Sequence, residues 1–171
     1  VDRAYLESIE REPLSERIVT LVEISASHPD RFPFRRALGE ARLAAGETTD
    51  ALRDLEAALE TAPDDPATLE ALARARFEAS DWDGALEAAR AAVRLDPGRI
   101  VAQIYLSVED LAARDYLAAI RRIENLRLRR ADRPLTGVEL LPLWMAYDRA
   151  LGRLAIGGDD AVGAVLSALA L

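Results

Sequence analysis

Residues 66–97 read PATLEALARARFEASDWDGALEAARAAVRLDP. Apolar residues recur here in two groups at three- and four-residue spacing, which is the spacing of one face of an α-helix. The turn Ser80-Asp81 separates the two groups, and Pro97 ends the second one. The stretch therefore predicts two helices joined by a short turn, which is a helical hairpin.

The same pattern occurs 34 residues upstream, and its matches fall at positions that would pack. The aligned pairs are Leu38 and Leu72, Gly39 and Ala73, Ala51 and Ala85, Leu52 and Leu86, Ala58 and Ala92, and Pro63 and Pro97. A third copy begins near Ile100 and keeps Leu106, Ser107, Ala119 and Ile120 in register. A repeat of this length is typical of a stacked array of helical hairpins.

These repeats resemble the tetratricopeptide repeat (TPR) family over about residues 32–131. The resemblance rests on Leu38-Gly39, on the alanines at Ala51, Ala85 and Ala119, and on Pro63 and Pro97. It implies an all-α fold, a right-handed α-solenoid of antiparallel helix hairpins, with about 8–10 helices in a chain of this length. Arg42, Arg76 and Asp110 depart from the family, which prefers an aromatic or large apolar residue there.

We expect one continuous solenoid domain divided by the repeat period. Its parts are a degenerate N-terminal hairpin at 1–31, repeats at 32–65, 66–99 and 100–133, and C-terminal capping helices or a degenerate repeat at 134–171. Ser15 is the expected N-cap of the second helix, and Asp65 and Asp81 those of the second repeat. Because residues 161–171 are apolar to the end, the rest of the fold, a missing segment or a partner must bury them.

Composition excludes several classes of protein. Half of the residues are apolar and 30% are charged, so the chain is neither disordered nor embedded in a membrane. The absence of cysteine excludes disulfides and thiolate chemistry. Arginine without lysine, together with abundant Ala and Leu, suggests a GC-rich bacterial source. The start at Val1 suggests a lost native start with a signal or anchor, and leaves the compartment open between cytoplasm and periplasm.

No residues are arranged for catalysis, so we predict a protein that is not an enzyme and needs no metal or cofactor. A Gly-rich phosphate loop and a Ser or Cys with a companion His are both missing from the sequence. Acidic pairs such as Asp64-Asp65 fall at helix ends, where capping explains them. The one histidine, His28, falls in a turn and is expected at the surface.

The family resemblance implies a partner site on the concave face, which the first helix of each hairpin lines. The positions that carry over are Arg36, Glu40 and Leu43, then Glu70, Arg74 and Phe77, then Ile104, Val108 and Leu111. The family's clamp for acidic chaperone tails needs Lys and Asn there, so that ligand is not expected. The predicted function is a scaffold or adaptor in a bacterial multiprotein assembly, binding a peptide or helix of a partner.

The helix from Ile100 to Leu111 is apolar on more than one face, which admits two interpretations. Either the following helices cover it, or it forms an apolar groove for a partner. A related alternative for the whole chain is self-assembly, in which the terminal helices of different copies stack end to end.

A second candidate site is a cluster of arginines near the end of the third repeat. Its members are Arg121, Arg122, Arg127, Arg129, Arg130 and Arg133. Their guanidinium groups suit carboxylate or phosphate. Three interpretations remain open: a solvated helix end with internal salt bridges, an acidic protein partner, and nucleic acid.

Overall fold

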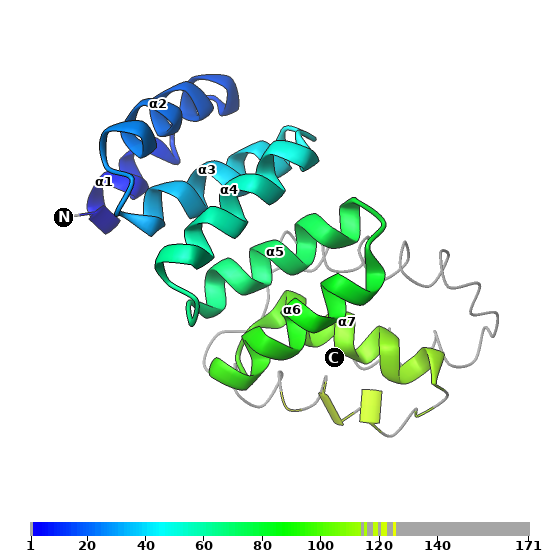
Figure 1. Ribbon diagram of the computed structural model, residues 1–171. Coiled ribbons are helices and arrows are strands. Elements are labelled where there is room, and N and C mark those ends of the chain that lie inside the picture. The colour runs from blue at the N-terminus through cyan, green and yellow to red at the C-terminus, as the bar shows by residue number, and fades with distance from the viewer. Residues whose placement is uncertain (1, 114, 116–117, 120, 123–124, 126–171) are drawn as a thin grey trace. The chain divides into compact units, whose positions relative to one another are not determined.

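The computed structural model describes residues 2–113, 115, 118–119, 121–122 and 125, and every element among them is helical (Figure 1). The helices are α1 (Asp2–Ile9), α2 (Leu14–Ser27), α3 (Phe32–Ala44), α4 (Thr48–Thr61), α5 (Pro66–Glu78), α6 (Trp82–Leu95) and α7 (Ile100–Ala112). This confirms the predicted all-α fold. Two compact units divide the chain, Val1–Leu95 with α1–α6 and Asp96–Leu171 with α7. The predicted helices at 134–171 lie outside the described residues.

Two helical hairpins make up most of the first unit. Helix α3 packs along α4, and α5 packs along α6, while α4 also contacts α5 and joins the hairpins (Figure 1). Ala51 on α4 and Ala85 on α6, which are equivalent in the repeat, are both fully buried. Small side chains at these points let the helix axes approach closely.

The two hairpins achieve their close helix approach with different pairs of residues. A Cβ atom added to Gly39 would lie 2.7 Å from Cγ of Leu55, which is fully buried. The equivalent positions in the second repeat hold Ala73 and Ala89, and both are fully buried. In the first hairpin a glycine, Gly39, therefore faces the large side chain of Leu55. In the second hairpin both equivalent residues are alanines.

Acidic residues cap the helices where the sequence predicts them. Asp65 Oδ2 accepts hydrogen bonds from Thr68 N at 2.8 Å and Thr68 Oγ1 at 2.6 Å. Asp81 Oδ1 accepts from Gly84 N at 3.0 Å, and Asp115, at the same place in the third repeat, accepts from Ala118 N at 3.0 Å. These contacts confirm the two predicted caps and satisfy amide groups that a helix start leaves without partners.

The prediction for Ser15 is wrong. Helix α2 already begins at Leu14, and Pro13 occupies the N-cap position without a side-chain hydrogen bond. Pro13 has a φ of −53°, so its ring already fixes a value close to that of a helix. The helix therefore begins one residue before Ser15, so Ser15 lies inside its first turn and cannot be its N-cap.

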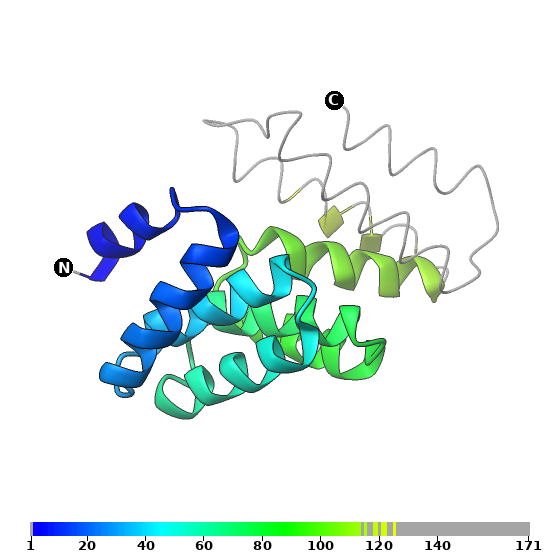
Figure 2. The ribbon, with the colours of Figure 1, turned by 90° about the horizontal axis from the view of Figure 1, so that it is seen from above.

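Helix α1 does not pair with α2 as the other hairpins do. It contacts α3, and in Figure 2 it diverges from α2. Ile9 joins a buried cluster with Leu21 and Leu38, while Arg17 Nη2 donates to the carbonyl oxygen of Glu10 at 2.8 Å. Residues 1–31 thus form the two expected helices, but α1 covers α3 instead of completing a hairpin with α2.

Charged pairs replace the aromatic residues that the family prefers at the departing positions. Arg42 on α3 forms an ion pair with Asp54 on α4. In the second unit the charges are reversed at the same repeat positions, because Asp110 pairs with Arg122 at 2.5 Å. Arg76 instead donates to the carbonyl oxygen of Gly84 at 3.2 Å. Arg42 and Asp110 therefore substitute an ion pair for an apolar contact within the hairpin, whereas Arg76 also forms an ion pair with Glu56 of the preceding hairpin at 3.6 Å.

Candidate functional site

Four charged residues on the first helices of the two hairpins form the candidate site, and we call them the charged face. Arg36 and Glu40 lie one turn apart on α3, and Glu70 and Arg74 lie one turn apart on α5. Arg36 aligns with Glu70 in the repeat, and Glu40 aligns with Arg74. Because α3 contacts α5, the repeat sets opposite charges at equivalent positions of neighbouring helices.

Glu40 is the electrostatic centre of this face. Solvent reaches its side chain, which is 46% exposed, yet protein atoms surround the carboxylate closely enough to raise its pKa. Arg36 and Arg74 oppose that rise, while Glu10 and Glu70 add to it. All four charges therefore act on one carboxylate, and Glu10 from the end of α1 joins the face that the sequence predicted from α3 and α5 alone.

Arg36 also has a structural role. Its Nη1 lies 3.2 Å from Oδ2 of Asp65, the N-cap of α5, so it ties the start of α5 to α3. Its Nε lies 3.8 Å from Glu40 Oε1, beyond hydrogen-bond distance. Burial alone would raise the pKa of Asp65, but the hydrogen bonds from Thr68 and the charge and hydrogen bond of Arg36 hold it below its usual value. Glu40 and the exposed Arg74 are thus the groups best placed to meet a partner.

The apolar residues of the predicted partner site are buried. Leu43, Phe77, Ile104 and Val108 are all at most 9% exposed. The Phe77 ring lies 5.3 Å from the Trp82 ring in an edge-to-face contact, so these two side chains pack within their own hairpin. Leu111 belongs to α7, but its side chain lies outside the described residues.

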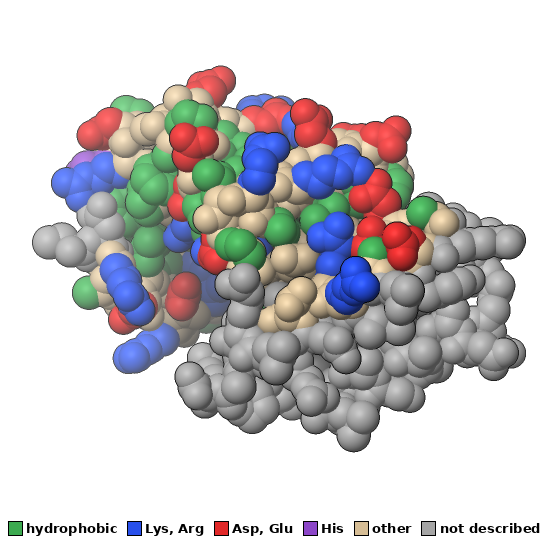
Figure 3. Space-filling view, turned by 90° about the horizontal axis from the view of Figure 1, so that it is seen from below, with side chains coloured by type: hydrophobic (Ala, Val, Ile, Leu, Met, Phe, Trp, Pro, Cys, Tyr) green, Lys and Arg blue, Asp and Glu red, His purple; other side chains and the backbone are tan. Residues whose placement is uncertain are grey.

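The arginine cluster is described only at its first two members. Arg121 is exposed, and Arg122 donates to Asp110 and, at 3.4 Å, to Gln103 Oε1. Arg122 therefore forms an internal salt bridge, one of the arrangements considered for the cluster. Arg127, Arg129, Arg130 and Arg133 lie outside the described residues. On the face shown in Figure 3, arginine and acidic side chains are interspersed over the described part of the molecule.

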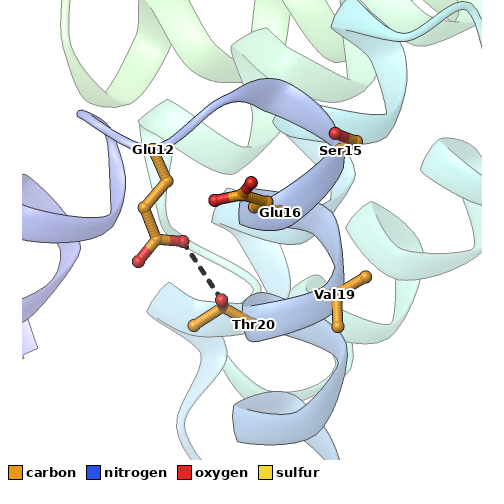
Figure 4. Close-up of a pocket in the computed structure, with 5 residues that line it drawn as sticks. All are labelled: Glu12, Ser15, Glu16, Val19 and Thr20. Atoms are coloured by element: carbon orange, nitrogen blue, oxygen red, sulfur yellow. Dashed lines mark hydrogen bonds between the residues drawn. The ribbon is translucent and has the colours of Figure 1, made fainter.

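An open groove lies along the start of α2. It measures about 490 Å³ and is lined by Glu12, Ser15, Glu16, Val19 and Thr20 (Figure 4). Thr20 Oγ1 and Glu12 Oε2 lie 3.1 Å apart in a hydrogen bond, which holds the Glu12 carboxylate against the helix. This surface was not predicted from the sequence, although Val19 and Val22, which lie outside the Leu14-Ile18-Leu21 face of the helix, were a signal for it.

We also searched the described residues for metal sites and for membrane-spanning helices. They include no group of three His, Cys, Asp or Glu side chains that could hold a metal ion. None of their helices has both the length and the apolar character needed to cross a membrane. His28 is exposed as predicted, and its ring centroid lies 6.3 Å from that of Phe34.

The family model for the tetratricopeptide repeat matches residues 36–100. This match confirms the resemblance to tetratricopeptide repeats that the sequence predicts for these residues. The match covers both hairpins that carry the charged face, and repeats of this family are generally non-catalytic modules for protein–protein interaction. A search of curated proteins gave no match.

Solved structures with similar folds include two of MamA. One, a crystal structure of MamA, has a TM-score of 0.62 and 16% identity over 92% of this chain and 87% of that chain. The other, MamA 41-end from Desulfovibrio magneticus RS-1, has a TM-score of 0.59 and 20% identity over 71% of this chain and 69% of that chain. Naa15/Naa10 bound to HypK-THB has a TM-score of 0.61 and 18% identity over 91% of this chain and 23% of that chain. At these identities the similarity supports the TPR-like solenoid fold.

Proposed function

We propose that this chain is a docking module that holds a segment of a partner protein on its charged face. The proposal rests on one observation, the reversal of charge between equivalent positions of α3 and α5 around the accessible carboxylate of Glu40. A face with alternating charge favours a partner segment with the complementary order and repels segments in the wrong register. The partner would place a basic residue opposite Glu40 and an acidic residue opposite Arg74.

The apolar residues of the predicted partner site are buried, so they support the fold and are not available to a partner. Leu43 and Phe77 stabilise the hairpins from inside, so partner contact falls to the charged side chains above them. Binding would then depend on salt, because exposed charges are screened within about 10 Å at ordinary ionic strength. We propose that the bound segment is a peptide or a helix that lies in the concave groove. Its parent protein would belong to a bacterial multiprotein assembly.

Photo-crosslinking in the native host tests this proposal. A photoreactive amino acid replaces Arg74, and the matched control replaces Arg53, an exposed arginine on the second helix of the first hairpin. We expect a partner to be captured at position 74 and not at position 53. With the purified partner, Arg74→Glu should weaken binding about tenfold, and Arg53→Glu should not. Capture of the same proteins at both positions, or equal affinity of both variants, would contradict the proposal.

The phosphate-binding alternative receives no support from the described arginines. Arg122 already binds Asp110, and nucleic-acid binding needs a continuous basic stripe. We therefore propose protein docking as the function of this chain.

A further inference from the structure

The outer face of α2 differs from the outer faces of α4 and α6. This face, which we call the α2 stripe, consists of Ser15, Val19, Val22 and Ala26, all exposed. Val19 is 60% exposed and Val22 is 39% exposed. The equivalent residues on α4 are Thr49, Arg53, Glu56 and Glu60, and those on α6 are Asp83, Glu87, Arg90 and Arg94, all exposed as well. The same repeat positions are thus polar or charged on two helices and largely apolar on the third.

Among the described residues, packing within the fold does not explain this difference. The adjacent side of α2, about a quarter turn away, already contacts α3 and buries Leu21 and Ser25. Members of the α2 stripe follow one another at intervals of four, three and four residues, the spacing of a seam that receives a second helix. The groove of about 490 Å³ runs along the first half of this seam (Figure 4). An exposed apolar seam of this kind is typical of a surface that a partner helix covers.

Charge along the seam indicates which helix would fit. Glu12, Glu16 and Glu23 follow one edge of the α2 stripe at helical spacing, and Glu12 is held there by Thr20. The nearest arginine of α2, Arg17, points its guanidinium at the carbonyl oxygens of Glu10 and Glu12 instead. The edge is therefore acidic, and a partner helix with Lys or Arg beside its apolar residues complements it.

We propose that the α2 stripe binds an amphipathic helix of a partner protein, with its apolar residues against Val19 and Val22 and its basic residues along the acidic edge. A second copy of this chain fits less well. Two α2 helices packed antiparallel about a two-fold axis would set their acidic edges side by side, where like charges repel. Anionic membrane lipids would be repelled by the same edge. The site is independent of the charged face, and it uses neither α5 nor Glu40.

Two synthetic helical peptides test the proposal with the full chain. Both carry Leu at the a and d positions, and one has Lys where the other has Glu at the flanking positions. Fluorescence anisotropy should show binding of the Lys peptide, weakened by added salt, and at least about tenfold weaker binding of the Glu peptide. Glu16→Lys with Glu23→Lys should reverse that preference.

The main variant carries Val19→Arg and Val22→Glu, which copies Arg53 and Glu56 of α4 onto α2. Its circular dichroism should be unchanged and its binding of the Lys peptide lost. A variant of the charged face, Glu40→Arg with Arg74→Glu, should bind that peptide normally, which separates this proposal from the proposed function. The proposal fails if neither peptide binds, if both bind equally, or if sedimentation shows a dimer that Val19→Arg with Val22→Glu abolishes, since a second copy would then be the occupant.

Discussion

Substitution of Gly39 by alanine tests how the first hairpin is packed. An added methyl group would lie 2.7 Å from Leu55 Cγ and 3.3 Å from the carbonyl oxygen of Ala51. Leu55 is fully buried and cannot swing into solvent, so the crowding should cost about 1–3 kcal/mol. Alanine is also a better helix former than glycine by about 1 kcal/mol, which offsets part of that cost. We expect a net loss of about 1 kcal/mol in the free energy of unfolding.

The second repeat suggests the compensating change. Leu55→Ala alone should leave a cavity and cost about 2–5 kcal/mol. In that background Gly39→Ala reproduces the pair Ala73 and Ala89 of the second hairpin. The clash with the Leu55 side chain is gone and only the 3.3 Å contact with the Ala51 carbonyl oxygen is left, while the gain in helix propensity remains, so the same substitution should now stabilise by up to about 1 kcal/mol. The two sites should therefore show a coupling energy of about 2 kcal/mol.

Urea unfolding followed by circular dichroism measures all four proteins of this cycle. Ala73→Gly in the second repeat is the matched control, and it should cost about 1–2 kcal/mol because it lowers helix propensity and removes a fully buried methyl group. If Gly39→Ala stabilises the chain equally with Leu55 and with Ala at position 55, then Leu55 moves aside at no cost. The close approach would then not explain the glycine, and the reasoning would be refuted.

Four further predictions follow from local contacts. Arg42→Asp should lower the free energy of unfolding by about 1–3 kcal/mol, because it leaves Asp54 beside a like charge. Adding Asp54→Arg copies the Asp110–Arg122 pair and should restore most of the loss, which urea midpoints would show. Gly46→Ala should cost about 1 kcal/mol in the same assay, because Gly46 has a φ of 81° and open space around it, so only the backbone resists the change. Asp65→Ala should cost about 0.5–2 kcal/mol in the free energy of unfolding at pH 7. Because the pKa of Asp65 is lowered in the folded protein, the stability difference between parent and variant should shrink as pH falls below 3.8, which urea unfolding at several pH values would show. Glu40 has a raised pKa, so its ionisation disfavours the folded state above pH 4.5, and Glu40→Gln should raise the thermal midpoint relative to the parent more at pH 7 than at pH 4.

The sequence predicted those parts of the fold that depend on local chemistry. Asp65 and Asp81 cap the helices as expected because a cap needs only one side chain three residues before the amide that it accepts from. The hairpins follow from apolar spacing and the repeat period. Pro13 shows the limit of this reasoning, because a proline and a serine can both begin a helix and the sequence alone does not rank them.

The parts that could not be predicted depend on how much neighbouring elements cover. The repeat register placed Phe77 on the same helix as two residues of the charged face. It could not show that the Trp82 ring packs against Phe77 and that the Phe77 side chain is buried. Arg42 and Asp110 looked like isolated departures because their partners lie 12 residues away on the next helix. Only the folded hairpin brings each charge to its counterpart.

Internal repetition makes the chain its own reference for separating packing from function. Ala51 and Ala85 are identical and fully buried, which is what a shared packing requirement produces. Glu40 and Arg74 of the charged face reverse their charge from one repeat to the next. Val19 and Val22 of the α2 stripe stand where α4 and α6 carry charges, and all of these side chains are exposed. Differences between copies at exposed positions are therefore unexplained by the fold. Because these differences gather on the charged face and on the α2 stripe, we propose these two surfaces as the places where partners bind.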